Sequence, residues 1–190
     1  MTRDQAYKIL TTHLKNKNLV NHCLATEACM EATHERLHPG GNEEEKKEWS
    51  LAGLLHDADY ETTKDTPQRH GLALFELEKD TDFPQNIKYA IQAHNFEMTG
   101  VEPQSDMDWA LIICDPITGL IVANALVTPN KKLSEVTPES VAKKFRQKAF
   151  ARGVEREKIA LCEEKLGIPL EEFIKLNLEA MQNISNNIGL

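Results

Sequence analysis

Apolar residues recur at helical spacing along the whole chain, whereas runs of strictly alternating apolar and polar residues are absent. The pattern therefore predicts an all-α fold. The segment 107–127 (MDWALIICDPITGLIVANALV) is apolar on every side, which predicts a central buried helix with a kink near Pro116. Further helices are expected over about residues 3–14, 17–37, 42–56, 69–78, 84–95, 138–151, 155–166 and 169–186.

Clusters of proline and glycine separate some of these helices. The sequence PGG at 39–41 ends the second predicted helix, and GIP at 167–169 precedes the last one. A chain of 190 residues without an internal repeat or a convincing linker suits one domain better than two. We therefore expect a single-domain helical bundle over residues 1–190, with a C-terminal helical extension over about 137–190.

Composition narrows the class of protein. The contents of 41% hydrophobic and 27% charged residues fit a soluble globular protein. The net charge of -8 argues against binding to a nucleic-acid polymer. The N-terminus lacks the apolar core of a signal peptide, and no window approaches the ~18 consecutive apolar residues of a membrane span. We expect a cytoplasmic protein that binds no membrane.

The cysteines are scattered without a CxxC pair, and each lies among helical apolar residues. We expect buried, reduced thiols, with a disulfide as the alternative. The four positions are Cys23, Cys29, Cys114 and Cys162.

Several polar side chains fall on surfaces that are expected to be buried. The stretch LAGLLHDADYE places His56 and Asp57 at the end of an apolar helix, where burial without a partner costs several kcal/mol. His22 flanks the apolar stripe of the second predicted helix, where a lone histidine is more often a hydrogen-bonded core residue than a metal ligand. Asp115 lies in a helix without a polar face and needs a buried Arg or Lys, a proton or a cation as partner.

These four residues form a candidate ligand set for a divalent metal ion. Two imidazoles and two carboxylates suit a borderline or hard ion such as Mn²⁺, Fe²⁺, Zn²⁺, Mg²⁺ or Ni²⁺. A shared cation would neutralise the carboxylates and accept the imidazole lone pairs. The predicted ligands are His22, His56, Asp57 and Asp115.

The order of these residues, a His, then an adjacent His-Asp pair, then a distant Asp, resembles the HD-domain superfamily of metal-dependent phosphohydrolases. The segments NHCLATEA, LAGLLHDADYE and LIICDPITGL carry the resemblance, which covers about Leu19 to Val122. It implies a helical metal-site core over about residues 17–126. It also places His70 and His94 where two-metal members carry additional ligands, with Asp57 as a bridge. Asn95 stands where many of those members have an adjacent histidine, so either one or two ions per chain are expected.

The resemblance further implies an enzyme that hydrolyses the phosphate ester of a small phosphorylated substrate, such as a nucleotide, by a metal-activated water. Two alternatives stay open: a non-catalytic metal-containing module for binding or sensing, and a diiron oxygenase-like relative. The sequence leaves the particular phosphate ester, the metal and the oligomeric state open.

Residues near the His-Asp pair supply candidates for catalysis and substrate binding. Asp57 and Glu61 are predicted to be catalytic. Glu61 and Asp59 are also placed to hydrogen-bond a metal-bound water or a ligating histidine, with solvated loop charges as the alternative. Lys64 and Arg69 flank the same loop within reach of an anionic substrate.

The main basic cluster lies in the stretch KKFRQKAFARGVER at 143–156. Lys148 and Arg152 are the preferred candidates for binding phosphate, with a solvated helix face as the alternative. The remaining histidines are expected at the surface. They are His13, His34 and His38.

Overall fold

A computed structural model describes all 190 residues, and it consists of helices and connecting loops without a β-strand. The all-α prediction is therefore confirmed. Two short 3-10 helices, η1 (Pro67–Arg69) and η2 (Leu133–Glu135), accompany the α-helices. The α-helices are α1 (Arg3–His13), α2 (Lys17–Leu37), α3 (Glu43–Leu55), α4 (Tyr60–Thr63), α5 (Ala73–Leu77), α6 (Gln85–Ala93), α7 (Phe96–Thr99), α8 (Asp106–Leu126), α9 (Pro138–Arg146), α10 (Arg156–Ala160), α11 (Cys162–Leu166), α12 (Leu170–Asn183) and α13 (Ser185–Ile188).

Side-chain caps define where α1, α2, α3 and α8 begin. Thr2 and Ser105 form capping boxes at the starts of α1 and α8, so each accepts a backbone N–H three residues later. Asn16 and Asn42 cap α2 and α3 by accepting the N–H two residues later. These local signals explain why the first three predicted helices begin within one residue of their observed positions.

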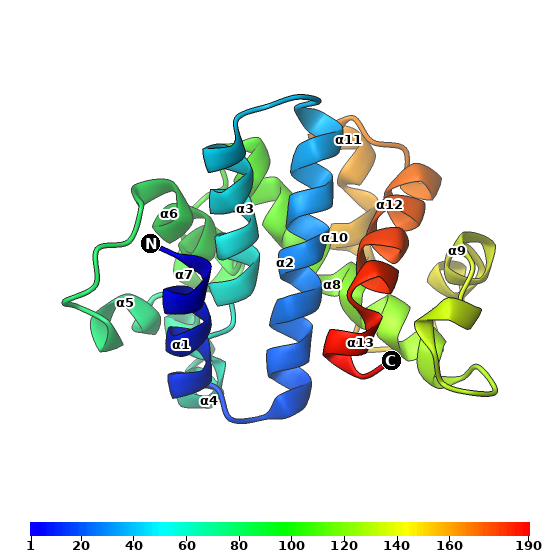
Figure 1. Ribbon diagram of the computed structural model, residues 1–190, viewed down its shortest axis with the longest axis horizontal. Helices are drawn as coiled ribbons and strands as arrows, with labels where there is room; N and C mark the ends of the chain where they lie inside the picture. The colour runs from blue at the N-terminus through cyan, green and yellow to red at the C-terminus, as the bar shows by residue number, and fades with distance from the viewer.

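Helix α2 packs closely against α3 and also contacts α8 and α12 (Figure 1). In Figure 1, α1 and α4–α7 lie on the α3 side of α2, and α9–α13 lie on the other side. Gly53 allows the close approach of α2 and α3, because a Cβ there would lie 2.8 Å from the carbonyl oxygen of Thr26. A larger residue at this position would push the two helices apart.

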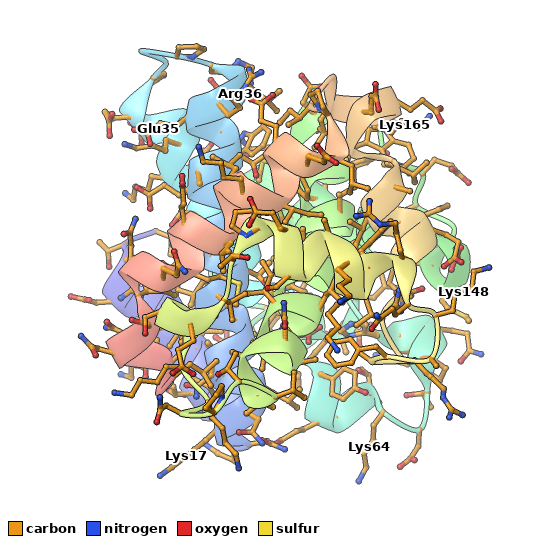
Figure 2. The ribbon with its side chains drawn as sticks, turned by 90° about the vertical axis from the view of Figure 1, so that its right-hand side faces the viewer. Lys17, Glu35, Arg36, Lys64, Lys148 and Lys165 are labelled. Atoms are coloured by element: carbon orange, nitrogen blue, oxygen red, sulfur yellow. The ribbon has the colours of Figure 1, made fainter.

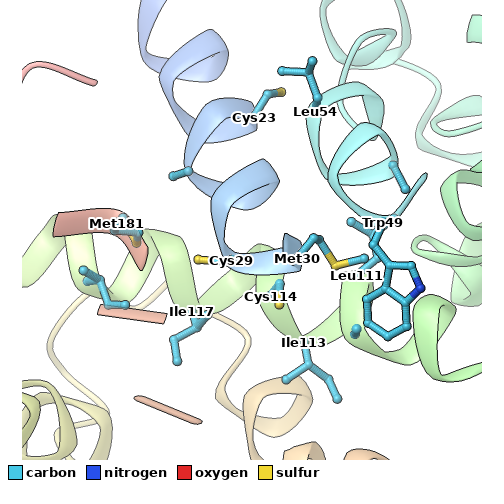
Figure 3. Packing of buried hydrophobic residues seen from close by; sticks show 14 of the residues in the cluster. Cys23, Cys29, Met30, Trp49, Leu54, Leu111, Ile113, Cys114, Ile117 and Met181 are labelled. Atoms are coloured by element: carbon cyan, nitrogen blue, oxygen red, sulfur yellow. The ribbon is translucent and has the colours of Figure 1, made fainter. Parts of the chain in front are cut away.

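One hydrophobic core of 39 buried residues runs from Ala6 to Ile188, as expected for a single packed unit (Figure 3). Helix α8 continues through Pro116 and supplies much of this core. By length and composition α8 is apolar enough to cross a membrane, but 67% of its most apolar window is buried inside the protein. The core helix of a soluble protein has the same property.

All four cysteines are buried and free, which agrees with the predicted reduced thiols. Figure 3 shows Cys23, Cys29 and Cys114 among apolar side chains of the core. Burial raises the pKa of the Cys114 thiol to about 12. These thiols are therefore protonated core residues at neutral pH.

The segment after η1 departs from the predicted helix over 69–78. Only Ala73–Leu77 is α-helical, because the buried Asp59 carboxylate accepts the backbone N–H groups of Gly71 and Leu74. Gly71 has a φ of +84°, and a Cβ there would lie 2.6 Å from the carbonyl oxygen of Ile91. The chain thus turns around Asp59 instead of continuing as a helix.

The predicted helix over 138–151 is also shorter than expected and ends at Arg146. The guanidinium of Arg156 donates hydrogen bonds to the carbonyl oxygens of Phe145, Phe150 and Ala151, which holds the following loop in place. Ala151 has a φ of +44°, which a helix does not permit. Arg156 is therefore a structural residue of this loop.

Candidate metal centre

The four predicted ligands from α2, the end of α3 and α8 meet at one place. His22 Nε2 lies 3.0 Å from Asp115 Oδ1 and 3.7 Å from Asp57 Oδ2. His56 Nε2 lies 3.5 Å from Asp57 Oδ1 and 3.9 Å from Asp115 Oδ1. His56 directly follows the last residue of α3, and Asp57 comes next. The apolar helix therefore places the His56 imidazole and the Asp57 carboxylate in the buried interior.

A second group shares Asp57 and contains both additional predicted histidines. His70 Nε2 lies 3.1 Å from Asp57 Oδ1, and His94 Nε2 lies 4.0 Å from the same oxygen. Ligand atoms of Asp57, His70 and His94 all lie within 4.8 Å of one another, and the same holds for His22, His56 and Asp57. Asp57 therefore belongs to two groups, each of which is positioned to hold a metal ion.

Hydrogen bonds at Nδ1 orient the two histidines of the first group. His22 Nδ1 lies 2.9 Å from Thr118 Oγ1, and the Thr118 hydroxyl donates to the backbone carbonyl of Asp115. The His22 ring must therefore be the donor in the first contact. His56 Nδ1 donates to the carbonyl of Gly53 at 2.8 Å. When these rings are neutral, both Nε2 atoms carry lone pairs that face the carboxylates.

The histidines of the second group are held in the same way. His70 Nδ1 donates to Asp59 Oδ1 at 2.8 Å, and His94 Nδ1 donates to the carbonyl of Ile91. Asp59 is fully buried and is itself fixed by backbone N–H groups. A carboxylate behind a histidine is a common arrangement around protein-bound metals, because it fixes the tautomer and makes the ring more basic.

Two features of the site call for a cation. His56 Nε2 is buried and has no hydrogen-bond partner, which is costly for a polar atom. His70 Nε2 and His94 Nε2 are 3.0 Å apart, and their Nδ1 atoms are both engaged as donors. With both rings neutral, two lone pairs would face each other. Metal ions fit this donor set, since they accept lone pairs from every Nε2 and neutralise the carboxylates.

A proton on His22 offsets part of the negative charge of the first group in the metal-free chain. Burial alone would lower the pKa of His22, but the hydrogen bond to Asp115 and the charges of Asp115 and Asp57 raise it to about 9. Burial would raise the pKa values of Asp57 and Asp115, but neighbouring imidazoles hold both below their usual range. The carboxylates are ionised at neutral pH and attract positive charge.

The second group contains two histidines with opposite shifts. Burial would lower the pKa of His70, but Asp57 and Asp59 raise it to about 10. Burial and the neighbouring imidazoles of His70 and His56 lower the pKa of His94 to about 4. In the absence of metal, a proton therefore resides on His70 and not on His94.

A pocket of about 400 Å³ opens onto both groups. Tyr60, Asn95, Glu155 and Lys158 are lining residues that the sequence did not single out as candidate ligands or substrate contacts. Lys158 Nζ lies 3.0 Å from each carboxylate oxygen of Glu155. The full lining comprises Leu19, His22, Asp57, Tyr60, His70, His94, Asn95, Asp115, Glu155 and Lys158.

A second, more apolar pocket of about 630 Å³ adjoins the first and shares His22 with it. Gly119, Val122 and Leu126 of α8 lie on its wall. A third pocket, of about 590 Å³, lies near Met1 and is larger than the pocket at the two groups. None of the candidate ligands lines it. The chemistry of the donors, and not pocket size, therefore locates the candidate site.

Glu61 does not belong to this site. Its carboxylate accepts the backbone N–H groups of Lys15 and Asn16 at 3.0 and 2.8 Å, just before α2. The prediction that Glu61 is catalytic is contradicted by these contacts. Asp59 is the acidic residue of the loop that contacts a candidate ligand, as one of the two sequence alternatives expected.

The predicted phosphate-binding cations do not line either pocket at the site. Lys64, Arg69, Lys148 and Arg152 are all exposed, and Figure 2 shows Lys64 and Lys148 extending outward from the edge of the molecule. Arg69 pairs with Glu76. Lys158 lines the pocket instead, and its signal in the sequence is the Glu-Arg-Glu-Lys spacing that pairs it with Glu155 on one turn of helix.

The remaining histidines are less exposed than predicted. His34 is buried, so the prediction of a surface position is wrong for this residue. His13 and His38 are partly buried, and His13 Nε2 lies 2.6 Å from Glu78. Tertiary contacts at the ends of α1 and α2 cover these rings, which helical periodicity alone does not reveal.

Comparison of the chain with protein-family models, curated proteins and solved structures finds no match. The fold and the side chains therefore define the class of protein. It is an all-α protein with buried His and Asp groups that are positioned to hold metal ions.

Proposed function

We propose that this protein is a metal-dependent phosphohydrolase that cleaves the phosphate ester of a small substrate such as a nucleotide. The observation that carries the proposal is the shared carboxylate of Asp57, which lies between two groups of inward-facing Nε2 atoms beside a pocket. Two metals bridged in this way are typical of enzymes that hydrolyse phosphate esters. The resemblance of the ligand order to the HD-domain superfamily supports the same chemistry.

The first ion would be held by His22, His56, Asp57 and Asp115, and the second by Asp57, His70 and His94. When bound there, divalent ions would supply a Lewis acid for a phosphoryl oxygen and would lower the pKa of water toward neutrality.

Protein groups then orient the substrate and the ligands. Lys158 offers an ammonium group to the phosphate on the pocket wall, where it is held by Glu155. Asp59 keeps the proton of His70 on Nδ1, so that Nε2 faces the pocket. Asn95 donates hydrogen bonds to the carbonyls of Pro67 and His70, which anchors the segment that carries His70.

The size of the pockets favours a small substrate. A volume of about 400 Å³ is within the range of small-molecule sites and is too small for a folded partner. The adjoining apolar pocket offers room for a ring system next to His22. A nucleotide combines a phosphate with a planar base whose faces can pack against apolar side chains.

The test is hydrolysis of a panel of nucleotides and other phosphate esters by metal-stripped protein to which Mn²⁺ is restored. We expect metal-dependent phosphate release by the wild type and none by Asp57→Ala, with Glu44→Gln as a matched exposed acidic control. Metal binding without hydrolysis of any ester would overturn the proposal in favour of a binding module. An optical band of a diiron centre together with oxygen consumption would overturn it in favour of an oxygenase.

A further inference from the structure

A third group of metal-binding side chains lies at the other end of α2. His34 belongs to the last turn of α2, His38 follows its last residue, and Glu45 belongs to the first turn of α3. Ligand atoms of the three residues lie within 4.8 Å of one another. His22 and His34 are twelve positions apart, which corresponds to about 18 Å along the helix, so this group is separate from the candidate centre. Figure 2 labels Glu35 and Arg36 at this end of α2 and Lys17 at the opposite end.

His34 is the unusual member of the group. Its side chain is only 2% exposed, and neither Nδ1 nor Nε2 has a hydrogen-bond partner. Buried polar atoms are almost always hydrogen-bonded, so an imidazole with two unpartnered nitrogens indicates a missing partner. Its Nε2 lies 3.8 Å from Glu45 Oε2, which is too long for a hydrogen bond.

Neighbouring groups pack against the two imidazole rings, and Glu45 is the member of the group that faces solvent. The Trp49 indole contacts the rings of His34 and His38, with centroid distances of 5.3 and 5.9 Å. Gly41 closes the loop over them, because a Cβ there would lie 3.3 Å from His34 Cε1. The Glu45 side chain is 47% exposed, so an ion and its water ligands can reach the group from solvent.

The nearest lysine is engaged elsewhere. Lys46 Nζ lies 3.0 Å from Glu43 and makes longer contacts with Glu31 and Glu35. Glu45 has no Lys or Arg partner, so its carboxylate is free to bind a cation.

We propose that His34, His38 and Glu45 bind one borderline divalent cation of the zinc class, which ties the end of α2 to the start of α3. Two imidazoles and a carboxylate form a common zinc donor set, and water completes the coordination. The 3.8 Å between His34 Nε2 and Glu45 Oε2 is less than the ~4.2 Å that two ligands at about 2.1 Å can span across one ion. The site is structural, since it lines neither pocket at the candidate centre.

The test uses Zn²⁺ alone and the emission of Trp49, in a chain where Trp109→Phe leaves Trp49 as the only tryptophan. We expect Zn²⁺ to change this emission with a stoichiometry of one. Glu45→Gln and His38→Ala should each weaken this transition at least tenfold, whereas Glu44→Gln, on the same turn of α3, should not. Asp57→Ala should leave the transition intact, which separates this site from the candidate centre.

Bound zinc is counted in the same proteins by elemental analysis. We expect Glu45→Gln to retain one ion fewer than the wild type and to melt at a lower temperature in the presence of Zn²⁺, with phosphate-ester hydrolysis unchanged. His34→Ala removes a buried side chain and could prevent folding. The variants Glu45→Gln and His38→Ala keep the test valid in that case. Equal zinc content and equal Trp49 response in wild type, Glu45→Gln and His38→Ala would overturn the proposal, whatever the outcome for phosphohydrolase activity.

Discussion

His70 Nε2 and His94 Nε2 lie 3.0 Å apart on the inner side of the site, while Asp59 and the carbonyl of Ile91 occupy their Nδ1 atoms. One positive charge has to lie at or beside this pair. In the metal-free chain it is a proton on His70, whose pKa is about 10. A metal ion bound by both rings and Asp57 would replace that proton.

Metal uptake should therefore release protons. With pKa values of about 9 and 10, His22 and His70 are protonated at pH 7 in the metal-free chain, and only the neutral rings bind metal. We expect about two protons to be released per chain when the site fills at pH 7, and metal affinity to rise with pH up to about 9 to 10. Calorimetry in buffers of different ionisation enthalpy measures the number released. Affinity that is independent of pH between 7 and 9 would contradict this assignment.

Removal of the Asp59 carboxylate should weaken metal binding without removing a ligand. Asp59→Ala leaves the His70 ring free to turn and frees the backbone N–H groups of Gly71 and Leu74. Substitution of a residue that hydrogen-bonds a metal ligand typically reduces metal affinity by about 10- to 100-fold. We expect a loss of this size for Asp59→Ala in a Mn²⁺ titration. Circular dichroism checks that the variant is folded. An unchanged affinity would show that Asp59 does not position His70.

Lys158→Ala should raise the KM for a phosphate ester about tenfold, since a charge-assisted contact to phosphate contributes roughly 1.5 kcal/mol or more. Lys64→Ala is the matched control, because Lys64 is an exposed lysine that lines neither pocket at the site. Steady-state kinetics separates KM from kcat. Equal KM values for the two variants would exclude Lys158 as a substrate contact.

Glu61→Gln should affect stability and not hydrolysis. The hydrogen bonds from the backbone of Lys15 and Asn16 lower the pKa of Glu61, so its contribution to stability is present above pH 4.5 and is lost as pH falls through the lowered value. We expect a lower melting temperature than the wild type at pH 7 and a smaller difference near pH 3. A large loss of activity in a folded variant would return Glu61 to the mechanism.

The sequence predicted much of this structure because its signals are local. Helical periodicity and capping residues predicted the positions of the long helices. The apolar character of α8 predicted that it lies in the centre of the core. The order of His22, His56, Asp57 and Asp115 gave the candidate ligand group, because polar residues on buried faces have to meet one another.

The errors concern contacts between distant segments. Nothing local distinguishes Asp59, which turns inward to His70, from Glu61, which turns outward to Lys15. Lys158 lines the pocket directly after a loop that Arg156 holds through backbone carbonyls, whereas charge density in the sequence favours Lys148. Loop paths of this kind depend on side-chain to backbone hydrogen bonds over many residues.

If Asp57 joins two metal groups in one hydrolytic site, its loss should remove both ions and the activity together, and the metal content of wild type and Asp57→Ala measures this. Each protein is stripped, reloaded with Mn²⁺ and counted by elemental analysis, with circular dichroism as the check on folding. We expect Asp57→Ala to hold two ions fewer per chain than the wild type and to release no phosphate. A folded Asp57→Ala protein that keeps the metal content and the phosphate-ester turnover of the wild type would contradict it.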